Sequence, residues 1–411
     1  MGIKNLKILF IVALIGLLIF SCEDTKDDED KEVPLPVITS IEPVAGYPGE
    51  EVTVTGENFN PVAALNLIHL TEGTVTLATI TPNTATETQL TFTRPVDVSG
   101  VGETINAMLA VQNLSDTDEK ISESVAIDIL PIFDVIGVTG MINAYDQPRT
   151  KGGITFDAAG DMYVRGQDPG KITKIASDGT QTYFGETQWG EGEMMCDANY
   201  LYAAQVWGDG GTTWRIPLSG GTAEEYISGT DAVYPFNLDF DDDGNFYIGS
   251  ADGIIFRKSA ADGSITTLID GLGWGAPMRV HDYDIYWYTR NDSANNGLWM
   301  APIPADGDTI ATGDITQILS SQDYSPSGLA VDGLGDVYLM DGWVDKNDYT
   351  IPGMLVRVTA AGVVEDVFEL PTQNPNFATW HDNKLYITAG ALDSTVYVLH
   401  LGEDRGSYAS P

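Results

Sequence analysis

From residue 152 onward the chain repeats one short pattern six times, and this repetition constrains its fold more than any other feature. Each copy is a short apolar run that ends at an aspartate, with a tyrosine four to six residues later. Successive aspartates are separated by 40, 44, 41, 50 and 50 residues. The aspartates are Asp157, Asp197, Asp241, Asp282, Asp332 and Asp382, and the tyrosines are Tyr163, Tyr202, Tyr247, Tyr286, Tyr338 and Tyr386.

One unit of this repeat predicts a small antiparallel sheet. The aspartate suits a tight turn, often with a glycine, and the tyrosine lies on the returning strand, where it packs on a neighbouring sheet. A sheet of about four strands buries both of its faces only between copies of itself, and six copies close a ring. The sequence therefore predicts a six-bladed β-propeller over residues 132–403, followed by a tail at 404–411.

The ends of this region indicate how the ring closes. The sixth unit runs out after its third strand, at residues 395–400, while an unassigned strand at 132–137 precedes the first unit. We expect that early strand to complete blade six as its outermost strand.

A separate small domain precedes the propeller, at residues 36–131. Its segments alternate apolar and polar residues and are broken by glycine and proline, which is typical of short antiparallel strands in a sandwich. The whole chain is therefore expected to be all-β. The strand-like segments are 36–43, 51–56, 74–80, 89–93, 107–112 and 124–129.

Two family resemblances follow from these patterns. The propeller region resembles six-bladed propellers of the NHL and senescence-marker/gluconolactonase type. The small domain resembles the IPT/TIG family of immunoglobulin-like domains, whose signature matches Ile41, Pro43, Gly46, Gly49, Val52-Thr53-Val54, Gly56 and Phe59.

The N-terminus has the pattern of an export signal. Lys4 and Lys7 precede an apolar run at 8–20, which is shorter than a membrane span and ends at Ser21-Cys22. This segment resembles a lipoprotein signal peptide at 1–21. The resemblance implies that Cys22 carries lipid, including palmitate, and anchors the protein in the outer membrane.

The acidic stretch after Cys22 cannot build a core, so residues 22–35 are expected to be a solvated tether. It resembles the surface-export signal of Bacteroidetes-type lipoproteins, which implies exposure on the cell surface. The chain has 60 acidic and 20 basic residues and a net charge of −40, which disfavours nucleic acid as a partner.

Tryptophan placement suggests a ligand site. All eight tryptophans lie in the propeller region, and four of them stand beside the starts of inner strands or the ends of second strands, at Trp189, Trp207, Trp274 and Trp343. The loops at those positions open on one face of a propeller. Packing between blades is the equal alternative for these four, and the expected role for Trp214, Trp287, Trp299 and Trp380.

Other residues are expected on the same rim. Flat aromatic rings stack on sugars, and acidic or amide groups beside them bind hydroxyls. The aromatic candidates are Tyr234, Phe236 and Tyr324, and the polar candidates are Asn237, Asp341, Asp209, Asp345 and Arg279. The predicted ligand is a polysaccharide, with the small domain as a spacer and an outer-membrane transporter as a further partner.

Two alternatives compete with this interpretation. One is a protein-binding scaffold. The other is a metal-dependent lactonase-like hydrolase, because gluconolactonase-type propellers hold a divalent metal with Glu, Asn and Asp, and Glu191 or Glu193 and Asn237 stand near comparable positions. The set is incomplete, since Ser327 replaces an expected Asn or Asp and neither Gly152 nor Pro277 offers a ligand.

No cofactor is expected apart from calcium at one acidic turn. Asp239, Asp241 and Asp243 have the spacing of the start of a calcium loop, but Ser250 stands where the bidentate acid belongs. The turn of a blade is the competing interpretation. His281 and His381 occupy equivalent repeat positions, which favours a structural role, and Cys196 is expected to be a buried thiol.

Overall fold

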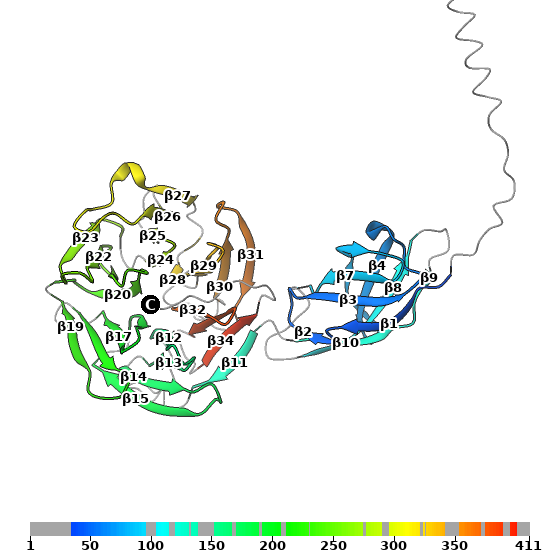
Figure 1. Ribbon diagram of the computed structural model, residues 1–411, viewed down its shortest axis with the longest axis horizontal. Coiled ribbons are helices and arrows are strands. Elements are labelled where there is room, and N and C mark those ends of the chain that lie inside the picture. Colours follow the sequence, from blue (N-terminus) through cyan, green and yellow to red (C-terminus); the bar gives the residue numbers. More distant parts are fainter. Residues whose placement is uncertain are drawn as a thin grey trace, which may run out of the picture.

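The computed structural model confirms an all-β protein with an N-terminal sandwich and a C-terminal propeller (Figure 1). No helix in the described part of the chain is long and apolar enough to cross a membrane. The structure describes residues 34–95, 104–114, 120–130, 133–138, 152–166, 170–188, 191–206, 211–229, 231–273, 277–289, 296–320, 324, 326–341, 353–370, 375–388 and 395–400.

Six four-stranded antiparallel sheets are arranged around one axis. Each inner strand contacts the inner strands of both neighbouring blades, and the contact between β12 (Ile154–Phe156) and β32 (Ala378–His381) closes the ring (Figure 1). The repeat thus predicted the number of blades correctly. Separate apolar clusters lie between adjacent blades rather than in one central core, as expected for radial repetition.

Within each blade the strands run consecutively from the axis outward. Blade one is β12, β13 (Met162–Arg165), β14 (Gly170–Ile175) and β15 (Gln181–Thr187); blade two is β16 (Met194–Cys196), β17 (Tyr200–Gln205), β18 (Thr212–Pro217) and β19 (Glu224–Ser228); blade three is β20 (Pro235–Phe240), β21 (Phe246–Ser250), β22 (Ile255–Lys258) and β23 (Ile265–Ile269). Blade four is β24 (Met278–His281), β25 (Asp284–Thr289), β26 (Gly297–Pro302) and β27 (Thr316–Ser320), with the 3-10 turn η2 (Thr312–Asp314); blade five is β28 (Pro326–Val331), β29 (Val337–Asp341), β30 (Met354–Val358) and β31 (Val364–Glu369).

Blade six joins the two ends of the propeller. Its strands are β32, β33 (Lys384–Thr388), β34 (Thr395–His400) and, outermost, β11 (Phe133–Gly137) from before the first blade. The β11 strand runs antiparallel to β34, with Phe133 opposite Leu399 and Gly137 opposite Thr395. The predicted closing strand is therefore confirmed.

In four blades the repeated aspartate bonds to the repeated tyrosine. Tyr247 Oη donates to Asp241 Oδ2 at 2.8 Å, while Asp241 Oδ1 accepts the backbone N–H groups of Asp243 and Asn245. One carboxylate thus caps the turn and holds the returning strand. The equivalent pairs are Asp157 with Tyr163, Asp197 with Tyr202 and Asp332 with Tyr338, at 2.9, 2.7 and 3.3 Å.

Blades four and six use a tighter turn at the same place. Asp282 and Tyr283 have φ values of 48° and 65°, and Asp382 and Asn383 have 47° and 60°, as a two-residue type I′ hairpin requires. The aspartate side chains are 85% and 78% exposed. All six aspartates thus follow an inner strand, but only the longer turns bring the carboxylate to the tyrosine.

Two of the four core tryptophans are fully enclosed. Trp380 packs edge-on against Tyr338 of blade five, and Trp287 lies in the cluster between blades three and four. Packing between blades is confirmed for these two. Trp214 and Trp299 are half-buried, and their indole N–H groups donate to Gln205 and Thr289.

The N-terminal domain is a sandwich of two sheets around one apolar cluster that includes Val52, Phe92 and Leu109. One sheet has the order β1 (Val37–Glu42), β3 (Glu51–Glu57), β7 (Gln89–Thr93) and β6 (Thr84–Ala85). The other has the order β2 (Ala45–Gly46), β10 (Val125–Ile129), β8 (Ile105–Asn113), β4 (Asn66–Glu72) and β5 (Val75–Ile80), with β9 (Lys120–Ile121) beside β8 and the 3-10 turn η1 (Ala63–Leu65) before β4.

Candidate functional site

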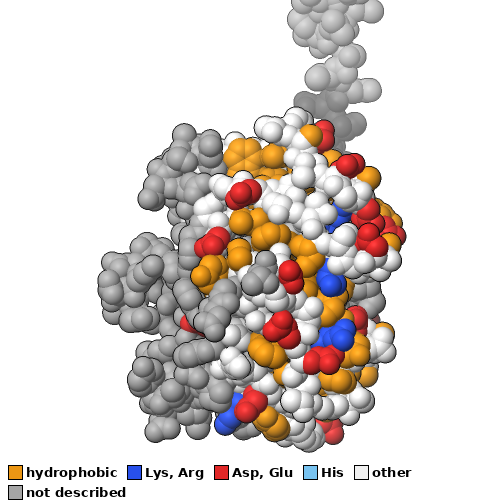
Figure 2. Space-filling view, turned by 90° about the vertical axis from the view of Figure 1, so that its left-hand side faces the viewer, with side chains coloured by type: hydrophobic (Ala, Val, Ile, Leu, Met, Phe, Trp, Pro, Cys, Tyr) orange, Lys and Arg blue, Asp and Glu red, His pale blue; other side chains and the backbone are white. Residues whose placement is uncertain are grey.

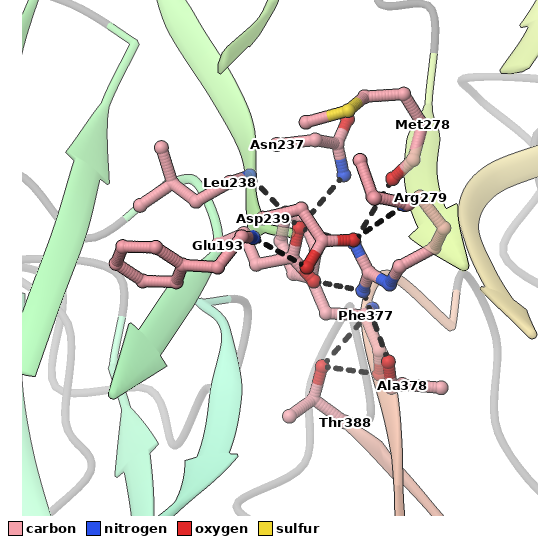
Figure 3. A network of polar contacts seen from close by, with 11 residues as sticks. Glu193, Asn237, Leu238, Asp239, Met278, Arg279, Phe377, Ala378 and Thr388 are labelled. Atoms are coloured by element: carbon pink, nitrogen blue, oxygen red, sulfur yellow. Dashed lines mark hydrogen bonds and ion pairs between the residues drawn. The ribbon is translucent and has the colours of Figure 1, made fainter. Parts of the chain in front are cut away.

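The candidate site lies near the propeller axis, where the inner strands begin (Figure 3). Backbone hydrogen bonds tie these starts to one another. The N–H group of Gly153 donates to Gly192 O at 2.9 Å, and that of Glu193 donates to Phe236 O at 2.8 Å. Blades one, two and three are therefore joined directly at this end of the ring.

Glu193 of blade two and Arg279 of blade four form a buried ion pair. Both Nη atoms of Arg279 donate to the carboxylate, with 2.6 Å between Nη1 and Oε2 (Figure 3). The side chain of Glu193 is 1% exposed and that of Arg279 is 5% exposed. A bidentate pair of this kind is among the strongest side-chain contacts, and neither charge would be tolerated there alone.

Further hydrogen bonds extend this pair to two more blades. Asn237 Nδ2 and the backbone N–H of Leu238, both in blade three, donate to Glu193 Oε2 at 3.3 and 3.1 Å. Arg279 Nη2 also donates to Ala378 O of blade six, at 3.1 Å. The ion pair thus connects blades two, three, four and six.

Asp239 makes a separate link between blades three and four. Its Oδ2 accepts the backbone N–H of Val280 at 2.7 Å, and its Oδ1 accepts the N–H of Phe240. Asp239 is fully buried. Its carboxylate therefore holds neighbouring inner strands together.

An aromatic pair lies at the same end of the inner strands. The rings of Phe236, in blade three, and Phe377, in blade six, have centroids 5.3 Å apart and are tilted by 52°. Phe377 is buried, while Phe236 is half-buried. Aromatic surface is therefore available beside the ion pair.

The other described rim candidates belong to blades three and five. Tyr234 is half-buried and has a φ of 47°, an unusual conformation for an aromatic residue, with its carbonyl accepting the N–H of Ala251. Tyr324 is half-buried, and its carbonyl accepts the hydroxyl of Tyr288. Asp341, at the end of β29, is 5% exposed.

The four rim tryptophans predicted to bind ligand lie outside the described residues, as do two of the acidic candidates. Their predicted role stays a prediction. They are Trp189, Trp207, Trp274, Trp343, Asp209 and Asp345.

Sequence reasoning missed the pairing of Glu193 with Arg279. It considered Glu193 as a metal ligand and Arg279 as a hydrogen-bonding group for a ligand, whereas both are buried against each other. A signal was present, because an arginine at the start of an inner strand points into the ring and needs a buried acid as partner.

The described residues at the axis do not fit a divalent metal ion. Both oxygens of Glu193 accept hydrogen bonds from the Arg279 guanidinium, and the Ser327 hydroxyl donates to Pro375 O. Within the described ranges, no three His, Cys, Asp or Glu side chains lie close enough together to hold a metal ion. The Arg279 guanidinium thus compensates Glu193, one of the two glutamates considered as a ligand here.

Two of the three carboxylates considered for calcium, those of Asp239 and Asp241, accept hydrogen bonds from other groups of the protein. Asp241 accepts four hydrogen bonds from the turn and Tyr247, and Asp239 points toward blade four. Asp241 and Asp243 do line a hollow of about 370 Å³ between blades three and four, on the face opposite the candidate site. The turn interpretation accounts for all the contacts of Asp241.

Comparison with known families identifies the sandwich. Residues 36–118 match the family model of the IPT/TIG domain, so the predicted resemblance of the small domain is confirmed. No curated protein matches the chain at a significant level.

Solved structures resemble this chain at low sequence identity. An auxiliary nutrient binding protein from Bacteroides thetaiotaomicron has 13% identity and a TM-score of 0.49, covering 89% of this chain and 97% of that chain. A gluconolactonase from Xanthomonas campestris has 13% identity and a TM-score of 0.50, covering 65% and 95%. At this identity the likeness concerns the fold alone.

Proposed function

We propose that this protein is a cell-surface lipoprotein whose propeller binds a polysaccharide on its axial face, the face where the inner strands begin. The IPT/TIG domain serves as the spacer, and lipid on Cys22 anchors the chain in the outer membrane. An outer-membrane transporter that receives the bound glycan is the partner expected for such a component.

The buried ion pair on the axis is the observation that carries this proposal. Arg279 neutralises Glu193, and the hydrogen bonds of this ion pair link four blades. The centre of the ring is therefore filled by a fixed ion pair and is not an open binding site. The half-buried ring of Phe236 lies beside this ion pair. A rigid floor with exposed aromatic surface suits the stacking of a sugar ring.

The charge of the protein further narrows the ligand class. Figure 2 shows acidic side chains scattered between apolar patches over the described part of one side of the molecule, with few basic ones. With a net charge of −40, the protein repels polyanions. We therefore propose a neutral rather than an acidic polysaccharide.

Binding to a panel of neutral and acidic polysaccharides tests the ligand. We expect the protein beginning at Glu23, which keeps every described residue, to bind a neutral glycan. Phe236→Ala, Trp189→Ala and Trp274→Ala should each weaken binding about three- to tenfold through lost stacking. Tyr283→Ala is the matched control, because Tyr283 is an exposed aromatic residue on the opposite face.

Three results would contradict the proposal. They are no binding to any glycan, equal loss in Tyr283→Ala, and binding only to a protein partner, which would favour the scaffold alternative. A lactonase-like hydrolase would instead show turnover that a chelator abolishes. Both carboxylate oxygens of Glu193 accept hydrogen bonds from Arg279, which does not favour a metal-dependent hydrolase.

The anchor is tested separately in cells. Labelled palmitate should be incorporated into the protein but not into Cys22→Ser. Protease added to intact cells should remove the propeller if it is surface-exposed.

A further inference from the structure

A stacked aromatic contact joins the IPT/TIG domain to the propeller. The ring of Tyr47, which directly follows β2, stacks on the ring of His400 at the end of β34, with centroids 3.7 Å apart and planes 1° from parallel. His400 is 4% exposed. The two domains thus share a small packed interface.

Asp134 of β11 ties both rings together. Its Oδ2 lies 2.9 Å from His400 Nε2 and accepts the hydroxyl of Tyr47 at 3.4 Å. Because β11 and β34 are the paired strands that close the propeller ring, the sandwich contacts the ring at its point of closure.

The loop that carries Tyr47 is held rigidly on the sandwich side. The backbone N–H of Tyr47 donates to Glu50 Oε2 at 3.2 Å, and the same carboxylate lies 3.5 Å from the buried guanidinium of Arg94. Arg94 also donates to Pro43 O at 2.6 Å. Pro48 restricts the backbone of Tyr47 to extended conformations.

The connection between the domains is short. Only residues 130–132 separate β10 from β11, and the N–H of Leu130 is still bonded to Gly46 O at 2.9 Å. A connection of this length with a packed contact beside it leaves little room for a hinge.

We propose that Tyr47, Asp134 and His400 form a fixed joint that holds the IPT/TIG domain in one orientation against blade six. Domains linked by a flexible tether and a small interface normally move relative to each other. Here a stacked pair, one shared carboxylate and a short connection remove that freedom, so the spacer sets the direction of the propeller. The joint does not depend on what the propeller binds.

Spin-label distance measurements on the protein beginning at Glu23 test the joint. Labels at Val75→Cys in the sandwich and Val363→Cys in blade five use exposed positions, and the native Cys196 is buried. We expect one narrow distance distribution. Tyr47→Ala should broaden the distance distribution about twofold or more, because the two domains can then move relative to each other.

Three further variants keep the test decisive. Tyr47→Phe retains the stacked ring and should stay narrow, and Tyr283→Ala, an exposed tyrosine far from the joint, should match the unmodified protein. His400→Ala removes the partner from the propeller side and should broaden the distribution even if Tyr47→Ala fails to fold. A broad distribution in the protein without these substitutions, or narrow distributions in both Tyr47→Ala and His400→Ala, would overturn the proposal.

Discussion

The buried ion pair between Glu193 and Arg279 gives the sharpest prediction. Glu193→Gln keeps the size of the side chain but leaves the Arg279 guanidinium 5% exposed with no counter-charge from Glu193. Removing one partner of a buried pair costs about 3–5 kcal/mol, because the remaining charge is neither solvated nor compensated. We expect the free energy of unfolding of the propeller to fall by that amount.

A second ion pair provides a matched control. Glu224 and Arg215 are also 2.6 Å apart, but their side chains are 51% and 31% exposed. Glu224→Gln makes the same chemical change at a solvated site, where an ion pair contributes about 1 kcal/mol or less. The difference between the two glutamine variants therefore measures burial rather than the loss of a carboxylate.

The double variant Glu193→Gln with Arg279→Met tests the cause. It removes both charges, so the cost should drop to about 1–2 kcal/mol, from weaker hydrogen bonds to Leu238 and Asn237. We expect the double variant to be more stable than Glu193→Gln alone, which corresponds to a coupling energy of about 2 kcal/mol or more.

Urea unfolding followed by tryptophan fluorescence is the appropriate assay. All eight tryptophans lie between residues 189 and 380, so the signal reports the propeller and not the sandwich. The reasoning is refuted if Glu193→Gln costs no more than Glu224→Gln, or if the double variant costs the sum of its two single changes.

Three further predictions concern the turns and the thiol. Tyr247→Phe should lower the free energy of unfolding by about 1.5–3 kcal/mol because it removes a hydrogen bond to the Asp241 carboxylate, whereas Tyr286→Phe, beside a tighter turn, should cost less than 1 kcal/mol in the same urea assay. Tyr283→Asn should raise the thermal midpoint, because asparagine adopts the φ of 65° at about 1 kcal/mol less strain than tyrosine; an unchanged or lower midpoint would argue against strain there. Burial raises the pKa of the Cys196 thiol, so it should resist alkylation at pH 8 in the folded protein and react once urea unfolds it, which mass spectrometry would detect.

The sequence by itself determined the architecture. Six aspartate–tyrosine repeats of nearly constant spacing can bury both faces of each sheet only by radial stacking, so the blade number and the closing strand Phe133–Gly137 followed from the pattern. The IPT/TIG domain was also recognisable from the sequence, because its turns need glycine and proline at fixed positions. Turn residues and repeat spacing depend on residues that lie close together in the chain, so both can be recognised in the sequence.

Only the tertiary structure decided how the centre of the ring is filled. Glu193 and Arg279 are 86 residues apart and belong to blades that are not neighbours, so no spacing or periodicity reveals that they meet. The same holds for Tyr47 and His400, which come from opposite ends of the described chain and stack where two domains meet. Contacts across the propeller axis, or between the two domains, form only when the ring of blades has closed. The closed ring therefore decides which charged side chains become partners.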